Sequence, residues 1–180
     1  GRVILLEDVL KKTVEKAAQE TKKRKTKGDP ESIGIASVKY SILKNSPQQD
    51  VNFSWEQALN FEGDTGPYLQ YSYARASSIL KKAGKSKKKL EIKTMEKSET
   101  ELIKKMLSFP GIVEQACRNL SPHLIANYSF HLAQAFNEFY HSSKVIGSEH
   151  EAFRLELIKK FRIIMAASLN LLGIDVLEEM

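Results

Sequence analysis

Hydrophobic residues recur every three or four positions along most of this chain, and this spacing places them on one face of an α-helix. It predicts a helix over 7–22, a second over 31–43 and a third over 67–83, where Gly84 stands at the expected C-terminal stop. Later helices are predicted to begin at three capping signals, which are Ser98 with Glu101, Ser121-Pro122, and Ser148 with Glu151. We therefore expect a mainly α fold in which the helices form a bundle.

Two short segments depart from the helical period. Residues 3–6 form an uninterrupted apolar run, and Val51, Phe53 and Trp55 alternate with polar residues, so both segments favour an extended conformation. Two glycines and a proline follow between residues 60 and 67, and we expect a domain boundary near residue 60. Because the chain starts with Gly1 instead of Met and enters the apolar run at once, we also expect a fragment of a longer protein.

Composition narrows the class of protein. The 180 residues are 42% hydrophobic and carry 28 Lys and Arg against 22 Asp and Glu, which is typical of a globular protein, here with a net charge of +6. No apolar run approaches the roughly 20 residues that span a bilayer, so we expect no membrane partner. The single cysteine, Cys117, cannot form an internal disulfide, and we expect a reducing compartment, the cytoplasm.

The positive charge is concentrated in two runs. Residues 11–27 and residues 81–97 each hold eight Lys or Arg against two Glu. Such runs either form solvated faces or contact the phosphates of RNA, and the sequence leaves both alternatives open. In neither case do they confer sequence specificity, because phosphates are the same at every position.

The predicted helix over 67–83 carries two stripes. The stripe spaced to face the core consists of Leu69, Tyr73, Ala76 and Leu80. Tyr68, Tyr71 and Arg75 lie on a neighbouring face, where two rings beside a guanidinium could stack unstacked RNA bases while the cation meets phosphate. The alternative is that the tyrosines cover the rim of the bundle with their hydroxyls in water. Tyr140, rotated by about 100° from the core position Phe139, is predicted to be partly exposed.

The sequence offers little support for catalysis or metal binding. Its four histidines lie eight to ten residues apart, too far for a local metal pair. It contains neither a phosphate-binding glycine motif nor a G-x-S-x-G nucleophile motif. Cys117 lies on an apolar stripe without an activating base, so we expect it to be a small buried hydrophobe. We predict no metal site and no catalytic residue in this chain.

The segment from Phe61 to Arg75, FEGDTGPYLQYSYAR, resembles the junction into the anticodon-binding domain of arginyl-tRNA synthetases, a class I family. Further segments resemble that family in the same order, namely VILLEDVL at 3–10, IGIASVKY at 33–40, FSW at 53–55, SFP at 108–110, LAQAFN at 132–137 and LLGI at 171–174. The resemblance thus extends over the whole chain.

This resemblance implies that residues 1–60 are the tail of the class I catalytic domain, a short truncated α/β remnant, and that residues 61–180 are the helical anticodon-binding domain. It also implies arginine tRNA, and not DNA, as the partner of a monomeric protein. The residues expected to meet the anticodon stem-loop are Asn60, Glu62, Asp64 and Thr65 in the junction loop, Tyr68, Tyr71 and Arg75 in the following helix, and Tyr140 and Met180 further along.

By the same resemblance, the parent enzyme would join arginine to its tRNA with ATP and Mg²⁺. The HIGH-type signature, the KMSKS-type lysine and the arginine pocket of that family do not occur in this sequence. We therefore expect a piece that holds no cofactor and has no activity of its own. The alternative from a different class is a helical scaffold whose basic runs bind RNA or other acidic partners without sequence choice.

Overall fold

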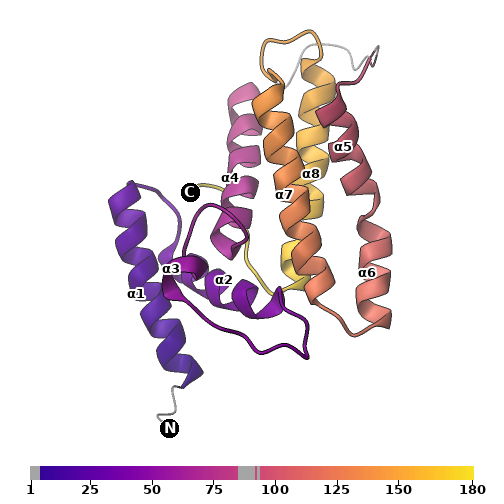
Figure 1. Ribbon diagram of the computed structural model, residues 1–180. Helices are drawn as coiled ribbons and strands as arrows, with labels where there is room; N and C mark the ends of the chain where they lie inside the picture. The colour runs from indigo at the N-terminus through magenta and orange to yellow at the C-terminus, as the bar shows by residue number, and fades with distance from the viewer. Residues whose placement is uncertain (1–4, 85–91, 93) are drawn as a thin grey trace.

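The computed structural model describes residues 5–84, 92 and 94–180, and the regular structure within these ranges is helical (Figure 1). Its eight helices are α1 (Leu6–Arg24), α2 (Pro30–Leu43), α3 (Trp55–Ala58), α4 (Gly66–Ala83), α5 (Lys97–Leu107), α6 (Phe109–Arg118), α7 (His123–Ser142) and α8 (Glu151–Leu171). The three helices predicted in the first half of the chain are confirmed to within two residues of their ends. Among the described residues, no helix is both long and apolar enough to cross a bilayer.

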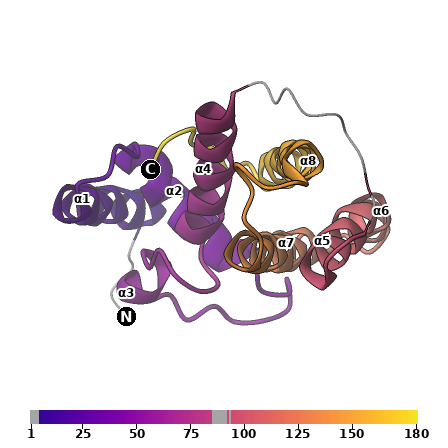
Figure 2. The same ribbon diagram turned by 90° about the horizontal axis from the view of Figure 1, so that it is seen from above.

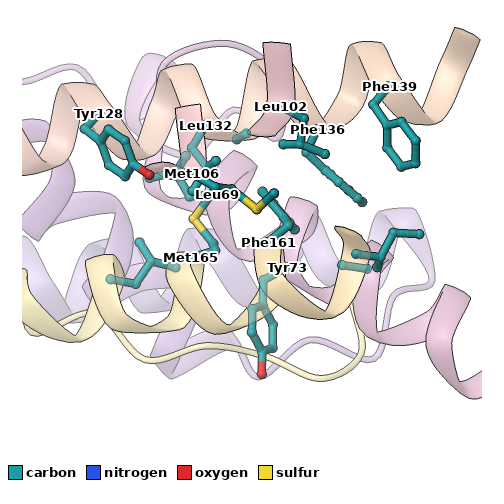
Figure 3. Close-up of a cluster of buried hydrophobic side chains, with 14 of the residues drawn as sticks. Leu69, Tyr73, Leu102, Met106, Tyr128, Leu132, Phe136, Phe139, Phe161 and Met165 are labelled. Atoms are coloured by element: carbon teal, nitrogen blue, oxygen red, sulfur yellow. The ribbon is translucent and has the colours of Figure 1, made fainter. Parts of the chain in front are cut away.

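Helices α4, α5, α7 and α8 form the bundle, and α6 extends it along α7 (Figures 1 and 2). Their apolar faces meet in one core, where side chains converge from the four helices (Figure 3). Within it the rings of Phe136 and Phe161 stack with centroids 4.0 Å apart. Leu69, Tyr73 and Ala76 are buried there and Leu80 packs against them partly buried, which confirms the predicted core stripe of α4.

The N-terminal helices α1 and α2 pack against each other, and α2 joins them to the bundle through α4. α2 begins where the carboxylate of Asp29 accepts a hydrogen bond from the backbone N–H of Ser32. Gly66, at the start of α4, lies so close to Ala36 that a Cβ on it would be 2.7 Å from the Ala36 carbonyl carbon. A smaller apolar cluster on this side consists of Ala17, Ile33, Leu59 and Phe61. The boundary near residue 60 stays a prediction.

The extended segments expected from the sequence are not strands where the structure describes them. Residues 1–4 lie outside the described ranges, and Leu6 already begins α1. Residues 51–54 form a loop, and Trp55 opens α3 because the hydroxyl of Ser54 caps that helix. Alternating apolar residues need a neighbouring strand to pair with, and this loop has none beside it in the described part of the chain. The predicted α/β remnant is therefore not seen.

The start of α5 corrects one predicted capping signal. The helix is capped by Glu96 and Glu99 instead of Ser98 and Glu101, since the backbone N–H of Glu96 donates to the carboxylate of Glu99 over 2.7 Å. Glu99 is buried and also accepts a hydrogen bond from Arg154 of α8 over 2.7 Å. Tertiary pairing with α8 thus decides which acidic residue closes this helix.

Helices α7 and α8 begin close to the predicted capping residues, but neither helix has the predicted side-chain cap. α7 follows Ser121-Pro122 without a hydrogen bond from a capping side chain. α8 begins at Glu151 with His150 at the cap position, so Ser148 lies outside the helix. The carboxylate of Glu151 accepts from the backbone N–H of Gly147 over 2.6 Å, and in this way the acidic residue still supports the helix start.

Cys117 is exposed, which contradicts its predicted burial. The short helix α6 packs along α7 and buries Ala116, and Cys117 is the next residue, turned by about 100° to the solvent side. An apolar stripe predicts the buried side of a helix poorly when the helix covers one edge of a bundle.

Candidate nucleic-acid interface

Helix α4 carries Tyr68, Tyr71 and Arg75 as half-buried side chains on one face. The hydroxyl of Thr65 accepts from the backbone N–H of Tyr68 over 3.3 Å, and Pro67 occupies the first turn. The helix start is therefore fixed immediately before the three side chains. Their spacing of three and four residues then aligns them along the helix, as predicted.

Arg75 lies between two aromatic rings. Its guanidinium carbon is 4.7 Å from the centroid of the Tyr71 ring and 5.2 Å from that of Tyr140 in α7. It also donates to the hydroxyl of Tyr71 over 3.0 Å and to the side-chain oxygen of Asn137 over 2.6 Å. These contacts bring together residues that the sequence only placed on separate helices, and they hold the cation in one orientation.

Asn137 connects the members of this cluster, and the sequence pattern did not point to it. Besides accepting from Arg75, its amide nitrogen donates to the hydroxyl of Tyr68 over 2.8 Å and to the hydroxyl of Ser72 over 3.1 Å. The residue is only 9% exposed although its side chain is polar. The available signal was an amide directly after Phe136, on a helix whose core stripe passes beside it.

Two open hollows share Tyr71 and Arg75 as a common wall. We call the larger one, of about 640 Å³, the Met180 hollow; it is also lined by Lys82, Tyr140, Lys144 and Met180. We call the smaller one, of about 490 Å³, the Thr26 hollow; it is also lined by Arg24, Thr26, Phe61, Glu62, Tyr68, Asn137 and His141. Four of the predicted residues, namely Tyr71, Arg75, Tyr140 and Met180, thus gather around the first hollow.

The C-terminal tail lies between α1 and α4 in both views (Figures 1 and 2). The carboxylate of Glu179 accepts from Lys81 at the end of α4 over 2.8 Å and from Lys27 over 3.4 Å. Hydrogen bonds from these two lysines hold the pKa of the Glu179 carboxyl below its ordinary value. Met180 packs near Ile33 and Gly28, and this position places it at the edge of the Met180 hollow.

The four predicted residues of the junction loop differ in burial: Asp64 and Thr65 make contacts within the fold, whereas Asn60 and Glu62 are exposed. Asp64 accepts from the hydroxyl of Tyr40 over 2.6 Å and from Lys44 over 3.1 Å. Burial and the Asp64 carboxylate together raise the pKa of Tyr40 above its ordinary range. Thr65 is buried and caps α4. The side chains of Asp64 and Thr65 therefore stabilise the fold through these hydrogen bonds.

The other two predicted loop residues remain near the surface. The side-chain oxygen of Asn60 accepts from the backbone N–H of Glu62 over 3.1 Å, which closes a turn. Glu62 is exposed and lines the Thr26 hollow beside Tyr68 and Tyr71. Of the four loop residues, Glu62 is the one that the structure brings to the tyrosines.

Cations surround both hollows. Lys82 and Lys144 line the Met180 hollow, and Arg24 and Arg75 line the Thr26 hollow, where Arg24 also lies 4.6 Å from the centroid of the Phe61 ring. Residues 85–91 and 93, which hold most of the second basic run, lie outside the described ranges. Within the described ranges, no group of three His, Cys, Asp or Glu side chains could hold a metal ion. The arrangement can stack planar groups and attract anions.

Aromatic rings and cations from several helices thus gather around the two open hollows. In comparison with known proteins, residues 69–180 match the model of the DALR anticodon binding domain. The chain therefore belongs to the DALR anticodon binding domain family.

Sequence relatives and solved structures that are similar to this chain are arginine–tRNA ligases. The chain is 39% identical over its whole length to the arginine–tRNA ligase of Clostridium acetobutylicum, of which it covers 34%. The arginyl-tRNA synthetase of Thermus thermophilus superimposes on 99% of the chain with a TM-score of 0.91 at 30% identity, and that of Plasmodium falciparum with a TM-score of 0.86 at 28% identity. The chain covers 32% and 34% of these two structures, so it spans about a third of the proteins it matches.

Proposed function

We propose that this chain binds the anticodon stem-loop of an arginine tRNA, as the anticodon-binding part of an arginine–tRNA ligase. The observation that supports this most directly is the guanidinium of Arg75, held between the rings of Tyr71 and Tyr140 at the wall of the Met180 hollow. Such a wall offers a base a planar surface and a positive charge together. The family name and the ligases among the relatives support the same proposal.

Binding would combine stacking with phosphate contacts. A base that enters the Met180 hollow meets the ring of Tyr140, and each stacked base contributes about 1–3 kcal/mol. Lys82 and Lys144 at the same hollow would attract the phosphates on either side of that base. An anticodon ordered in this way would help to place the distant acceptor end of the tRNA for the reaction.

The chemistry of the whole ligase would take place outside this chain. We expect the full protein to join arginine to its tRNA with ATP and Mg²⁺ in the cytoplasm. The HIGH-type signature and the KMSKS-type lysine of that family do not occur in this sequence, so we assign the ATP and Mg²⁺ chemistry to the remainder of the ligase. The role we propose for this chain is therefore recognition and positioning.

A second candidate is binding of RNA by charge alone. Lys22, Lys23 and Lys25 are exposed around the C-terminal end of α1 and would contact phosphates of any sequence. This candidate predicts affinity that falls steeply with salt and does not depend on the anticodon.

The affinity of the chain for arginine tRNA at physiological salt, compared with the same tRNA carrying a changed middle anticodon base, separates the two candidates. We expect preference for the native anticodon, and a loss of about ten-fold or more when Tyr71→Ala and Arg75→Ala are combined. Arg118→Ala, on the exposed face of α6, is the matched control and should bind as the unchanged chain does. Equal binding of both tRNAs that disappears with salt would favour the second candidate and contradict the first.

A further inference from the structure

The two basic runs of the chain meet at the C-terminal tail, which lies between α1 and α4 (Figures 1 and 2). Lys27 is the last residue of the first run and lies in the connection between α1 and α2, and Lys81 is the first residue of the second run, near the end of α4. Both donate to the carboxylate of Glu179, Lys81 over 2.8 Å and Lys27 over 3.4 Å. The tail therefore joins cations from two distant parts of the sequence.

The two lysines share this carboxylate evenly. Lys81 donates to Oε1 of Glu179 and Lys27 donates to Oε2, so that each oxygen faces one ammonium group. Two positive charges around one negative charge leave this place positive. A phosphate of the RNA backbone also presents charged oxygens as strong acceptors. Such a phosphate can therefore take the place of the carboxylate between the two ammonium groups.

All three side chains are open to solvent. The side chains of Lys27 and Lys81 are 81% and 78% exposed, and that of Glu179 is 45% exposed. An exposed ion pair contributes little to stability, because water solvates both charges, so an RNA phosphate displaces this carboxylate at small cost. The release of counterions from the RNA favours the exchange.

The neighbouring carboxylate keeps the tail in place during such an exchange. Glu178 accepts from the hydroxyl of Tyr73 in α4 over 2.9 Å and from the guanidinium of Arg162 in α8 over 2.9 Å. These contacts do not involve the two lysines. Glu179 can therefore leave the lysines while Glu178 still holds the tail to the bundle.

The lysine pair lies beside the Met180 hollow but does not line it. Lys82 and Met180 line that hollow. They are the residues that directly follow Lys81 and Glu179 in the sequence. An RNA strand that places a base in the hollow therefore passes close to the lysine pair with its backbone.

We propose that Lys27 and Lys81 together bind a phosphate of the RNA backbone, and that the carboxylate of Glu179 occupies this position in the free protein as a competing anion. The inference rests on the proposed function in one respect, namely that RNA is the ligand. RNA of any sequence has to displace Glu179 before it reaches the two lysines. The carboxylate thus weakens attraction that depends on charge alone, which two basic runs would otherwise favour.

Glu179→Gln removes the competing charge and nearly keeps the shape of the side chain. Its affinity for arginine tRNA at low salt should rise about three-fold, the size of one phosphate contact. Glu101→Gln is the matched control, because Glu101 accepts from Lys104 over 2.8 Å in an exposed pair on α5 and its loss changes the net charge equally. This control should change the affinity by less than about half as much. Filter binding over a series of salt concentrations measures both variants.

The variant that combines Lys27→Gln with Lys81→Gln removes the phosphate position itself. Its affinity for arginine tRNA should fall, and the slope of log affinity against log salt should become shallower by about 0.7–0.9, the effect of one lost phosphate contact. Glu179→Gln added to this variant should no longer raise the affinity, since no lysine pair remains for which the carboxylate and the phosphate compete. The change in net charge is the same with and without the lysines, so the comparison isolates the competition.

Three outcomes would overturn the inference. The first is a Glu179→Gln variant that binds as the Glu101→Gln control does, the second is one that binds more weakly than the unchanged chain, and the third is a gain that persists without the two lysines. A weaker Glu179→Gln variant would mean that the carboxylate serves to hold the tail and does not compete with RNA.

Arginine tRNA with a changed middle anticodon base keeps this test apart from the proposed function. Glu179→Gln should raise the affinity for both tRNAs by the same factor, because their phosphates are the same. If the unchanged chain does not distinguish the two tRNAs, anticodon recognition is wrong, and the gain in Glu179→Gln still decides the competition. If the chain distinguishes them and Glu179→Gln gains nothing, the competition alone is wrong.

Discussion

The guanidinium of Arg75 donates to the side-chain oxygen of Asn137 over 2.6 Å and thereby joins helices α4 and α7 where the tyrosines gather. The same amide donates to the hydroxyl of Tyr68. One buried side chain therefore orients both a cation and a ring of the proposed interface. Groups that are oriented before binding lose less conformational entropy when a ligand arrives.

Replacing Asn137 by alanine removes its hydrogen bonds to Arg75, Tyr68 and Ser72. We expect Asn137→Ala to lower the free energy of unfolding by about 1–3 kcal/mol, because Arg75 and Ser72 lose hydrogen bonds in a buried place. The affinity for arginine tRNA should fall about three- to ten-fold under conditions in which the variant is fully folded. Denaturant unfolding and filter binding measure the two effects.

Asn127→Ala is the matched control for this variant, since Asn127 lies exposed on the same helix. It should change neither quantity measurably. If Asn137→Ala loses stability but binds tRNA with unchanged affinity, the amide supports the fold alone, and the orientation of Arg75 does not matter for binding.

The helices and the core stripe of α4 could be predicted from the sequence because both follow from local periodicity. Leu69 and Tyr73 are buried where a period of 3.6 residues places them. Periodicity also placed Tyr68, Tyr71 and Arg75 on one face. It could not show that this face meets Tyr140, because the crossing of α4 and α7 depends on packing between distant segments.

The wrong predictions of the α5 capping residues and of Cys117 burial have a common cause. In both places contacts between distant segments, and not the local sequence pattern, determine the structure. Glu99 replaced Ser98 and Glu101 at the start of α5 because it pairs with Arg154, which is 55 positions away in the sequence. Cys117 is exposed because α6 covers one edge of the bundle. The role of Asn137 could not be recognised without knowing that Arg75 lies opposite it.

Arg154 and Glu99 form a buried ion pair that should be costly to break. Their side chains are 5% and 1% exposed, and the guanidinium also donates to Glu96 and to the carbonyl of Lys144. Arg154→Met leaves the carboxylate of Glu99 buried without its cation, so we expect the free energy of unfolding to fall by about 3–5 kcal/mol. Urea unfolding monitored by circular dichroism measures this change.

Arg118→Met provides the comparison, since Arg118 pairs with Glu114 on the exposed face of α6. Its loss should cost about 0.5 kcal/mol or less, because water solvates both charges. Similar losses in Arg154→Met and Arg118→Met would mean that the buried pair contributes no more than a surface pair.

Replacing Gly66 or Gly111 by alanine should change the stability of the protein in opposite directions. A Cβ at Gly66 would collide with the backbone of Ala36, so Gly66→Ala should destabilise the protein by about 1–3 kcal/mol and loosen the contact between α2 and α4. A Cβ at Gly111 meets nothing within 4 Å, and Gly111→Ala should stabilise α6 by about 0.5–1 kcal/mol. Thermal unfolding of both variants checks the pair, and a destabilised Gly111→Ala would contradict the expectation.

The C-terminal tail should be held less strongly at acid pH. Hydrogen bonds from Lys81 and Lys27 lower the pKa of the Glu179 carboxyl below its ordinary value of 4.5. Burial opposes the charge of Glu178, but bonds from Tyr73 and others outweigh it and lower that pKa as well. A carboxyl whose pKa is lower in the folded state stabilises the fold fully above about pH 4.5, and this stabilisation is lost as the pH falls through the folded-state pKa.

The variant that combines Glu178→Gln with Glu179→Gln isolates this contribution. We expect its melting temperature to lie below that of the unchanged chain at pH 7 and the two temperatures to converge as the pH is lowered from 5 to 3. Glu96, whose pKa is also lowered, is present in both proteins, so its titration cancels in the difference. The NMR signal of the Met180 methyl group should shift over the same pH range, since the tail carries Met180 to its hollow. Melting temperatures that stay equally far apart at every pH would show that these two carboxylates do not hold the tail through their charge.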